Sequence, residues 1–167
     1  MAIRDDTFAT RRHLPHLGRT GATYFVTFST IERLVLTPAA RDVTLDCCIH
    51  NHNRTYFLHC AVIMPDHVHM LLTPHDRWTL PKILRRVKGV SSRYANRRMN
   101  RLGPLWQDES FDRVLRSDED TRRKAEYICA NPVRAGLVSS EDQYPWIWRE
   151  WIEGQRTDRQ DCLSSTR

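Results

Sequence analysis

Apolar positions along the chain follow two periods, and the changes of period delimit the expected elements. Alternating or continuous apolar runs with the length of β-strands occupy residues 22–31, 56–64, 67–73 and 111–116. Apolar residues at helical spacing occupy residues 38–51 and 80–101, which follow Thr37 and Thr79 in the N-cap position. The short Pro65-Asp66 turn between the second and third strands predicts a hairpin.

The resulting order, β-α-β-β-α-β, predicts an α+β fold of the ferredoxin-like type, an antiparallel sheet with both helices on one face. The opposite face would then be free for a functional site. An additional C-terminal helix is expected after the fourth strand, because residues 117–120 (Ser-Asp-Glu-Asp) resemble a capping box. This helix should end near Asn131, since Pro132 disfavours helical backbone in the residue before it. The aromatic stretch 144–151 is expected to pack back on the core.

Length and composition indicate one basic domain. A chain of 167 residues suffices for one ordinary core, so we expect a single domain over residues 1–167, with a core of about 20–152, a basic N-terminal arm and a polar, disordered C-terminal tail. The net charge of +6 is carried by arginine, which favours a polyanionic partner. Five cysteines without C-x-x-C spacing, and no apolar leader or membrane-spanning segment, favour a cytoplasmic protein.

Two histidines in the third strand are the first candidate for chemistry. His67 and His69 are two residues apart, so on a strand they project to one face, while Val68, Met70 and Leu72 face the other. Two imidazoles on one face can chelate a metal ion, although a hydrogen-bonded pair of core histidines is the simpler reading. The neighbouring residue, Asp66, could orient an imidazole or cap the turn.

The additional helix carries a candidate nucleophile. Tyr127 and Asn131 share a face at i and i+4, with Arg123 and Lys124 one turn earlier, although the segment could also be a packing helix that ends at an Asn-Pro stop. A free tyrosine has a pKa near 10, so forming the phenolate at pH 7 costs about 4 kcal/mol. The nucleophile therefore needs an activated electrophile. Mg²⁺ or Mn²⁺ held by the two histidines and one further ligand could polarise a phosphodiester.

The second long helix is a candidate nucleic-acid interface. It has no acidic residue between positions 82 and 101, whereas a merely solvated face usually mixes charges of both signs. The residues expected to bind DNA, including the two cations of the additional helix, are Arg85, Arg86, Lys88, Arg93, Arg97, Arg98, Arg123 and Lys124. Trp78 and Trp106 could stack on bases or belong to the core.

With these residues in view, the chain resembles the HUH single-tyrosine (IS200-like) transposases, and within them the REP-associated tyrosine transposases of bacteria. The segments that carry the resemblance are 24–28, 62–72, 105–107 and 127–138. It implies that His67 and His69 bind a divalent metal, that Tyr127 is the nucleophile, and that Asn131 is the third ligand, where the insertion-sequence branch usually has glutamine. It further implies nicking and joining of single-stranded DNA beside a REP-like hairpin during DNA transposition, through a 5′-phosphotyrosine intermediate. The protein would work near the nucleoid as a monomer or homodimer, without a nucleotide cofactor.

Two other functions fit parts of the pattern. A non-catalytic, ferredoxin-like protein that binds single-stranded nucleic acid would need aromatic residues on the open sheet face and would form no covalent adduct. A metal-dependent phosphodiester hydrolase would use the same histidines to activate water and would survive Tyr127→Phe.

Overall fold

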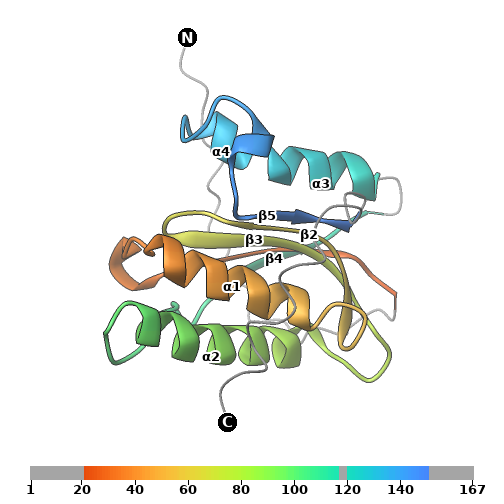
Figure 1. Cartoon of the computed structure of the whole chain (residues 1–167). Coiled ribbons are helices and arrows are strands. Elements are labelled where there is room, and N and C mark those ends of the chain that lie inside the picture. Colours follow the sequence, from red (N-terminus) through yellow and green to blue (C-terminus); the bar gives the residue numbers. More distant parts are fainter. Residues whose placement is uncertain (1–20, 117–119, 151–167) are drawn as a thin grey trace.

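The computed structural model describes residues 21–116 and 120–150, which build a five-stranded antiparallel sheet with helices on both faces (Figure 1). The strands are β1 (Tyr24–Ser29), β2 (Tyr56–Ile63), β3 (His67–Pro74), β4 (Phe111–Val114) and β5 (Ile147–Arg149). The helices are α1 (Pro38–His50), α2 (Leu80–Arg98), α3 (Thr121–Cys129) and α4 (Asn131–Arg134), with 3₁₀ turns at Ile31–Arg33 and Glu141–Gln143.

The strand order is β4-β1-β3-β2-β5, and every neighbouring pair is antiparallel. The first four strands have the arrangement expected of a β-α-β-β-α-β chain, so the ferredoxin-like prediction is confirmed, including the β2–β3 hairpin. The edge strand β5 was not predicted as a strand. Its three residues are too few to display an alternating pattern, although the expected packing of this segment on the core is correct.

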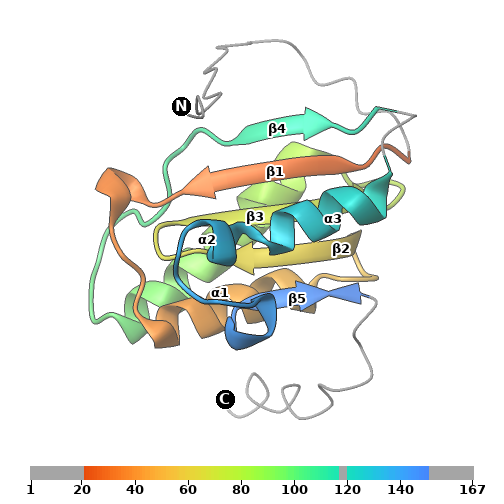
Figure 2. The ribbon, with the colours of Figure 1, turned by 90° about the horizontal axis from the view of Figure 1, so that it is seen from above.

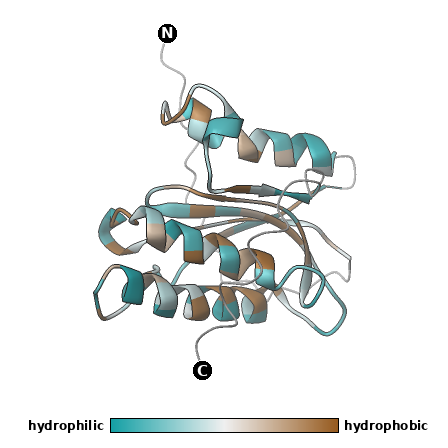
Figure 3. Ribbon diagram, in the orientation of Figure 1, coloured by the Kyte–Doolittle hydropathy of each residue, from teal (hydrophilic) through white to brown (hydrophobic). Residues whose placement is uncertain are grey.

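Helices α1 and α2 cover one face of the sheet, as predicted. Their apolar sides enclose the main core together with the inward side chains of β1 and β3, among them Val26, Val68 and Met70, all fully buried. Figure 3 shows hydrophobic and hydrophilic residues interleaved along these helices, the pattern of helices with one buried side. The hydroxyl of Thr37 accepts a hydrogen bond from the Ala40 amide at 3.3 Å and so caps α1.

Both ends of α2 differ in detail from the prediction. Thr79 occupies the N-cap position, but its side chain makes no capping hydrogen bond. The helix ends at Arg98, before the expected Arg101. Asn100 adopts a left-handed conformation, and the Arg101 guanidinium donates to Asn96 Oδ1 and to the Pro104 carbonyl, which turns the chain back on the helix.

The other face of the sheet is only partly open, so the expectation that it is free is wrong where α3 covers β2 and β3. Helix α3 packs Ala125 and Ile128 into a second apolar cluster with Val62 and Leu71 of β2 and β3. Seen from above, α3 lies over the middle of the sheet, while β1 and β4 lie beside it (Figure 2). Any site on this face must therefore form along β1, β3 and the neighbouring side of α3.

Helix α3 starts and ends close to the predicted positions. Its cap is Asp120, whose carboxylate accepts the amides of Arg122 and Arg123, whereas the rest of the expected capping box, 117–119, lies outside the described residues. Helix α3 ends at Cys129, close to the expected Asn131, but a second short helix, α4, which was not predicted, starts directly at Asn131. Proline is tolerated there because it stands in the first turn of a new helix, where its missing N–H has no helical partner to lose.

The predicted N-terminal arm, residues 1–19, and the tail after Gln155 also lie outside the described residues. Within the described part of the chain, none of the helices has the length and apolar character needed to cross a bilayer.

Candidate active site

His67 and His69 lie side by side on the α3 face of β3, as their spacing predicted. Their Nε2 atoms are 3.1 Å apart, while each Nδ1 has a separate partner. His67 donates from Nδ1 to Asp66 Oδ1 at 2.6 Å, and His69 Nδ1 is 2.8 Å from the hydroxyl of Thr27 on β1. Such partners fix the orientation of an imidazole, which leaves both Nε2 atoms directed at one point.

The carboxylate of Asp66 is itself held in place. Its second oxygen, Oδ2, forms an ion pair with Arg33 Nε at 3.0 Å. The Arg33–Asp66–His67 chain therefore supports the orienting role that the sequence had left open for Asp66. The alternative, a side-chain cap of the turn, is not needed, because this carboxylate already has two partners.

The surroundings keep His69 uncharged. Burial is the largest cause that lowers its pKa, to about 3, and His67, Arg134 and Lys124 lower the pKa further. A neutral imidazole offers a nitrogen lone pair to a metal ion. Because the two Nε2 atoms face each other, one of them carries the proton they share, and metal binding would require that proton to leave. The Thr27 hydroxyl can accept a hydrogen bond as well as donate one, so it can hold His69 in either tautomer.

The histidine pair thus fits two ligand positions of a divalent cation. In residues 21–116 and 120–150, no three side chains of His, Cys, Asp and Glu come together as a metal cluster. A neutral oxygen, such as the predicted amide of Asn131, remains a candidate for the third ligand. Two imidazoles and an amide suit Mn²⁺ better than Mg²⁺, and a substrate phosphate would complete either site.

Tyr127 projects from the last turn of α3 into solvent, with 58% of its surface exposed. Two cations flank its ring. The Arg134 guanidinium lies 4.0 Å from the ring centroid and Lys124 Nζ lies 5.1 Å from it. Lys124 Nζ is also 4.8 Å from the ring of Phe25, which stacks on His69. The tyrosine and the histidine pair therefore share one face of the molecule, with positive charge between them.

The amide of Asn131 is engaged within the protein. Its Nδ2 donates to the Ile128 carbonyl and its Oδ1 accepts from Arg134 Nη2, both at 2.8 Å. Arg134 Nη1 donates to the Tyr127 carbonyl at the same distance. The role of Asn131 as a third metal ligand stays a prediction, and it requires the amide oxygen to exchange Arg134 for the metal.

Arg134 was missed as a site residue, although it lies in the segment that carries the resemblance. It follows Tyr127 by seven positions and lies in the short helix α4, which starts directly after α3 ends. No helix was expected after Asn131, so this relation was hidden. Thr27 and Phe25 were also missed, because cross-strand neighbours of the histidines become visible only once the β1–β3 register is known.

The basic helix α2 lies on the opposite side of the sheet from the histidines and Tyr127 (Figure 1). Arg85, Arg86, Arg93, Arg97 and Arg98 are exposed there, and Arg123 is exposed on α3. Their predicted contacts with DNA are not tested by this arrangement. Trp106 is buried and donates from its indole to Ser91 Oγ, so of its two predicted roles the core role is confirmed.

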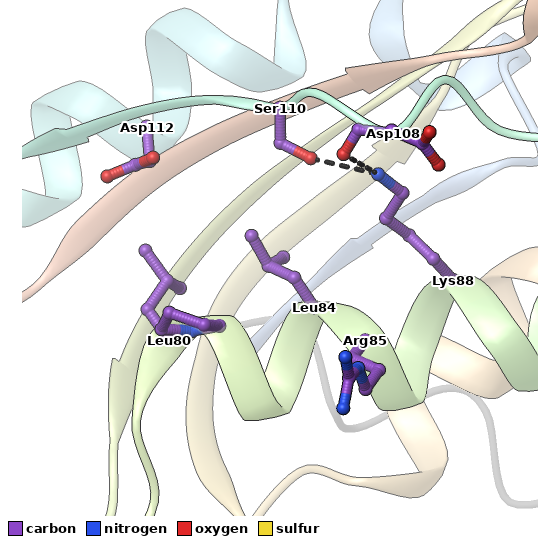
Figure 4. A pocket seen from close by; sticks show the side chains of 8 residues that line it. Leu80, Leu84, Arg85, Lys88, Asp108, Ser110 and Asp112 are labelled. Carbon is purple, nitrogen blue, oxygen red and sulfur yellow. Dashed lines mark hydrogen bonds between the residues drawn. The ribbon is translucent and has the colours of Figure 1, made fainter. Parts of the chain in front are cut away.

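Lys88 of α2 is hydrogen-bonded to the loop before β4. It donates to the carbonyls of Gln107 and Asp108 and to Ser110 Oγ, at 2.5, 3.0 and 3.2 Å. Desolvation lowers its pKa, an effect that the Asp108 carboxylate opposes. Lys88 lines a pocket of about 540 Å³. Figure 4 shows its side chain reaching from α2 toward Asp108 and Ser110. The pocket is lined by Leu80, Pro81, Leu84, Arg85, Lys88, Asp108, Ser110 and Asp112 and contains none of the candidate ligands or the nucleophile.

We expect Lys88→Ala to destabilise the fold by about 1–2 kcal/mol, because the loop before β4 loses its anchor and two carbonyls lose a donor. Urea denaturation measures this change. Lys82→Ala, an exposed lysine on the same helix, is the control and should leave the stability unchanged. Unchanged stability of Lys88→Ala together with weaker DNA binding would contradict the structural role.

Three comparisons relate this chain to known proteins. The family model described as "Transposase IS200 like" matches residues 26–129, a range that contains both histidines and Tyr127 but stops before Asn131. The REP-associated tyrosine transposase of Escherichia coli (strain K12) is 24% identical over 98 residues, which cover 56% of this chain and 54% of that protein. The chain therefore spans about half the length of this curated relative. The structure of a REP-associated tyrosine transposase bound to a REP hairpin superposes with a TM-score of 0.62 at 20% identity, covering 81% of both chains, and shows that the fold is shared.

Proposed function

Because the chain belongs to the IS200-like transposase family, we propose that it is a metal-dependent strand transferase that cuts and rejoins single-stranded DNA through Tyr127. The single observation that carries this proposal is the common face of the site. The convergent Nε2 atoms of His67 and His69 and the exposed Tyr127, with Lys124 beside its ring, all lie on that face. This arrangement offers a nucleophile, two metal ligands and a phosphate-binding cation.

The proposed reaction is a transesterification. Tyr127 Oη attacks the phosphorus of a phosphodiester, so that the Oη–P bond forms and the P–O3′ bond breaks. The electron pair of the broken bond stays on O3′, which takes up a proton from solvent to give a free 3′-OH, while the phenolic proton passes to the water around the exposed ring. The product is a 5′-phosphotyrosine, and attack of a 3′-OH on it rejoins a strand without an external energy source.

Each residue of the site has a separate role in the proposed reaction. Lys124 and Arg134, which flank the ring of Tyr127, offer positive charge to the non-bridging phosphate oxygens. His67 and His69, with Asn131 as the predicted third ligand, would hold Mg²⁺ or Mn²⁺, which polarises the phosphodiester when bound. Asp66 and Thr27 fix the imidazole rings, so that the ligand pair is preorganised before substrate arrives.

The proposed substrate is single-stranded DNA beside a hairpin of REP type. The relative in the structural comparison is bound to such a hairpin, and this chain shares its fold. The exposed arginines of α2 lie on the far side of the sheet, so we assign them to a distant segment of the same DNA. Cutting and rejoining at such sites would serve DNA transposition or recombination, by a monomer or a homodimer in the bacterial cytoplasm.

We expect the double variant Arg93→Ala/Arg97→Ala to bind the hairpin DNA more weakly and with a shallower salt dependence. Each lost contact should reduce the slope of log K against log [salt] by about 0.7 units on a single strand and about 0.9 on a duplex. Fluorescence anisotropy over a salt series measures the slope. Arg54→Ala, an exposed arginine in the turn before β2, serves as the control. An unchanged slope in the double variant would remove α2 from the DNA interface.

The proposal is tested by incubating the full chain with labelled hairpin oligonucleotides from the repeats that flank its own gene, with Mg²⁺, Mn²⁺ or EDTA, on a denaturing gel. A covalent adduct that needs metal supports the strand transferase. Metal-dependent cutting without an adduct would indicate a hydrolase, and tight binding without cutting would indicate a non-catalytic nucleic-acid-binding protein.

A further inference from the structure

Phe111 is an aromatic side chain whose exposure packing does not explain. It lies in β4, the open edge strand of the sheet, yet 52% of its surface is exposed. Among residues 21–116 and 120–150, Phe111 and Tyr127 are the aromatic members of the exposed large apolar side chains. Leaving about half of a phenylalanine in water forgoes part of the free energy that its burial would supply. A single exposed apolar residue is common, so the case for binding rests on the neighbours of Phe111.

The β1–β4 register places Phe111 on the same face as the histidines. It pairs with Thr27, the residue that holds His69. The Phe111 ring meets the ring of Phe25 edge-on, with centroids 6.1 Å apart, and Phe25 in turn stacks on His69 at 5.7 Å. A row of three rings, Phe111, Phe25 and His69, therefore runs from the edge strand β4 to the histidine pair, and its middle member, Phe25, packs against the apolar cluster under α3.

Positive charge lies next to this row. Lys124 Nζ is 4.8 Å from the Phe25 centroid and 5.1 Å from the Tyr127 centroid, so it stands between the row and the tyrosine. Arg113 of β4 pairs with Phe25 and thus belongs to the same face. Aromatic rings beside cations are what a single strand of nucleic acid needs, since bases stack on the rings while phosphates meet the cations. An apolar protein segment would instead have to desolvate Lys124.

We propose that Phe111, supported by Phe25, is a stacking subsite for an unpaired base that flanks the phosphodiester attacked by Tyr127. Lys124 then contacts the attacked phosphate, which adjoins the nucleotide of that base. The subsite rests on the proposed strand transfer for its position but not for its existence, because stacking requires no chemistry. It places the single-stranded flank over β1 and β4, the strands that lie beside α3 in Figure 2.

The test uses hairpin oligonucleotides with 2-aminopurine placed at each position of the single-stranded flank in turn, bound to the full chain in EDTA so that no cutting is needed. We expect the fluorescence of one flanking position to be quenched by stacking. Phe111→Leu, which keeps apolar bulk without a π face, should abolish the quenching and weaken binding by about 5- to 150-fold. Phe111→Trp should restore both. Val114→Ala, an exposed residue of the same strand on the other face, is the control.

Unchanged quenching and affinity in Phe111→Leu would overturn the subsite, even if the metal-dependent adduct forms as proposed above. Failure of the proposed strand transfer can also be told apart from failure of the subsite. Quenching that depends on Phe111, in a protein that forms no adduct with either metal, would refute the strand transfer and the position of the subsite beside a cleaved bond. Light scattering tests the alternative that Phe111 contacts a second copy of the chain. If Phe111→Leu reduces the particle mass, Phe111 is such a contact and the subsite is wrong.

Discussion

Tyr127→Phe is expected to abolish the covalent protein–DNA adduct while leaving the affinity for hairpin DNA within a few-fold of wild type. The substitution removes only Oη, the atom that would attack phosphorus. The ring that Lys124 and Arg134 approach is retained, and the exposed position makes a folding defect unexpected. Because Oη is the atom that would form the bond to phosphorus, the loss should reach the detection limit of a denaturing gel, and strand rejoining should be lost with it.

The matched control for this variant is Tyr94→Phe. Tyr94 is a partly buried tyrosine of α2 and packs against the core on the opposite side of the sheet. It should form the adduct like wild type. If Tyr127→Phe still produces nicks in the DNA, the nucleophile is assigned incorrectly, and water activated at the histidine pair becomes the better account.

His69→Ala is the second change with a large expected effect. It removes one of the two convergent Nε2 atoms, so Mn²⁺ binding measured by calorimetry without DNA should weaken by more than about 100-fold, since losing an outer partner of a ligand alone costs 10–100-fold. The metal-dependent adduct should disappear in parallel. Thr27→Val, which removes the hydroxyl that holds the ring, should give a smaller loss of the same two signals.

His59→Ala is the control for a histidine of similar environment. His59 is also partly buried and is also bonded to a threonine, with Nε2 2.8 Å from Thr73 Oγ1. It should bind Mn²⁺ and form the adduct normally. Metal affinity that is the same in His69→Ala as in His59→Ala would show that the histidine pair is a packing feature, which was the simpler reading of the sequence.

The sequence predicted the sheet and the face of the histidines well, because both follow from the two-residue period of a strand. Burial of Val68, Met70 and Leu72 in the main core leaves His67 and His69 no alternative but the other face. The sequence could not place α3, because no local pattern states which part of a sheet a helix will cover. The apolar Ala125 and Ile128 indicated a buried side, but their partners on β2 and β3 are distant in sequence.

The electrostatic part of the site was also beyond sequence patterns. Arg134 approaches Tyr127 from the short helix α4, which starts directly after α3 ends and was not expected. Lys88 was predicted to bind DNA as part of a basic helix, and that role stays a prediction. Its ammonium group donates to the Gln107 and Asp108 carbonyls and to Ser110 Oγ in the loop before β4, contacts that no charge pattern reveals. Charge counts reveal a helix face, but they do not tell which cations already have partners.

The central claim is that Tyr127 becomes covalently linked to DNA, and the most direct measurement is mass spectrometry of the adduct after digestion with protease and nuclease. The account predicts a remnant nucleotide, attached through a 5′-phosphate, on the peptide that contains Tyr127, and only in samples that contained Mg²⁺ or Mn²⁺. A remnant on any other residue, or an unmodified Tyr127 peptide from DNA that has been cut, would contradict it.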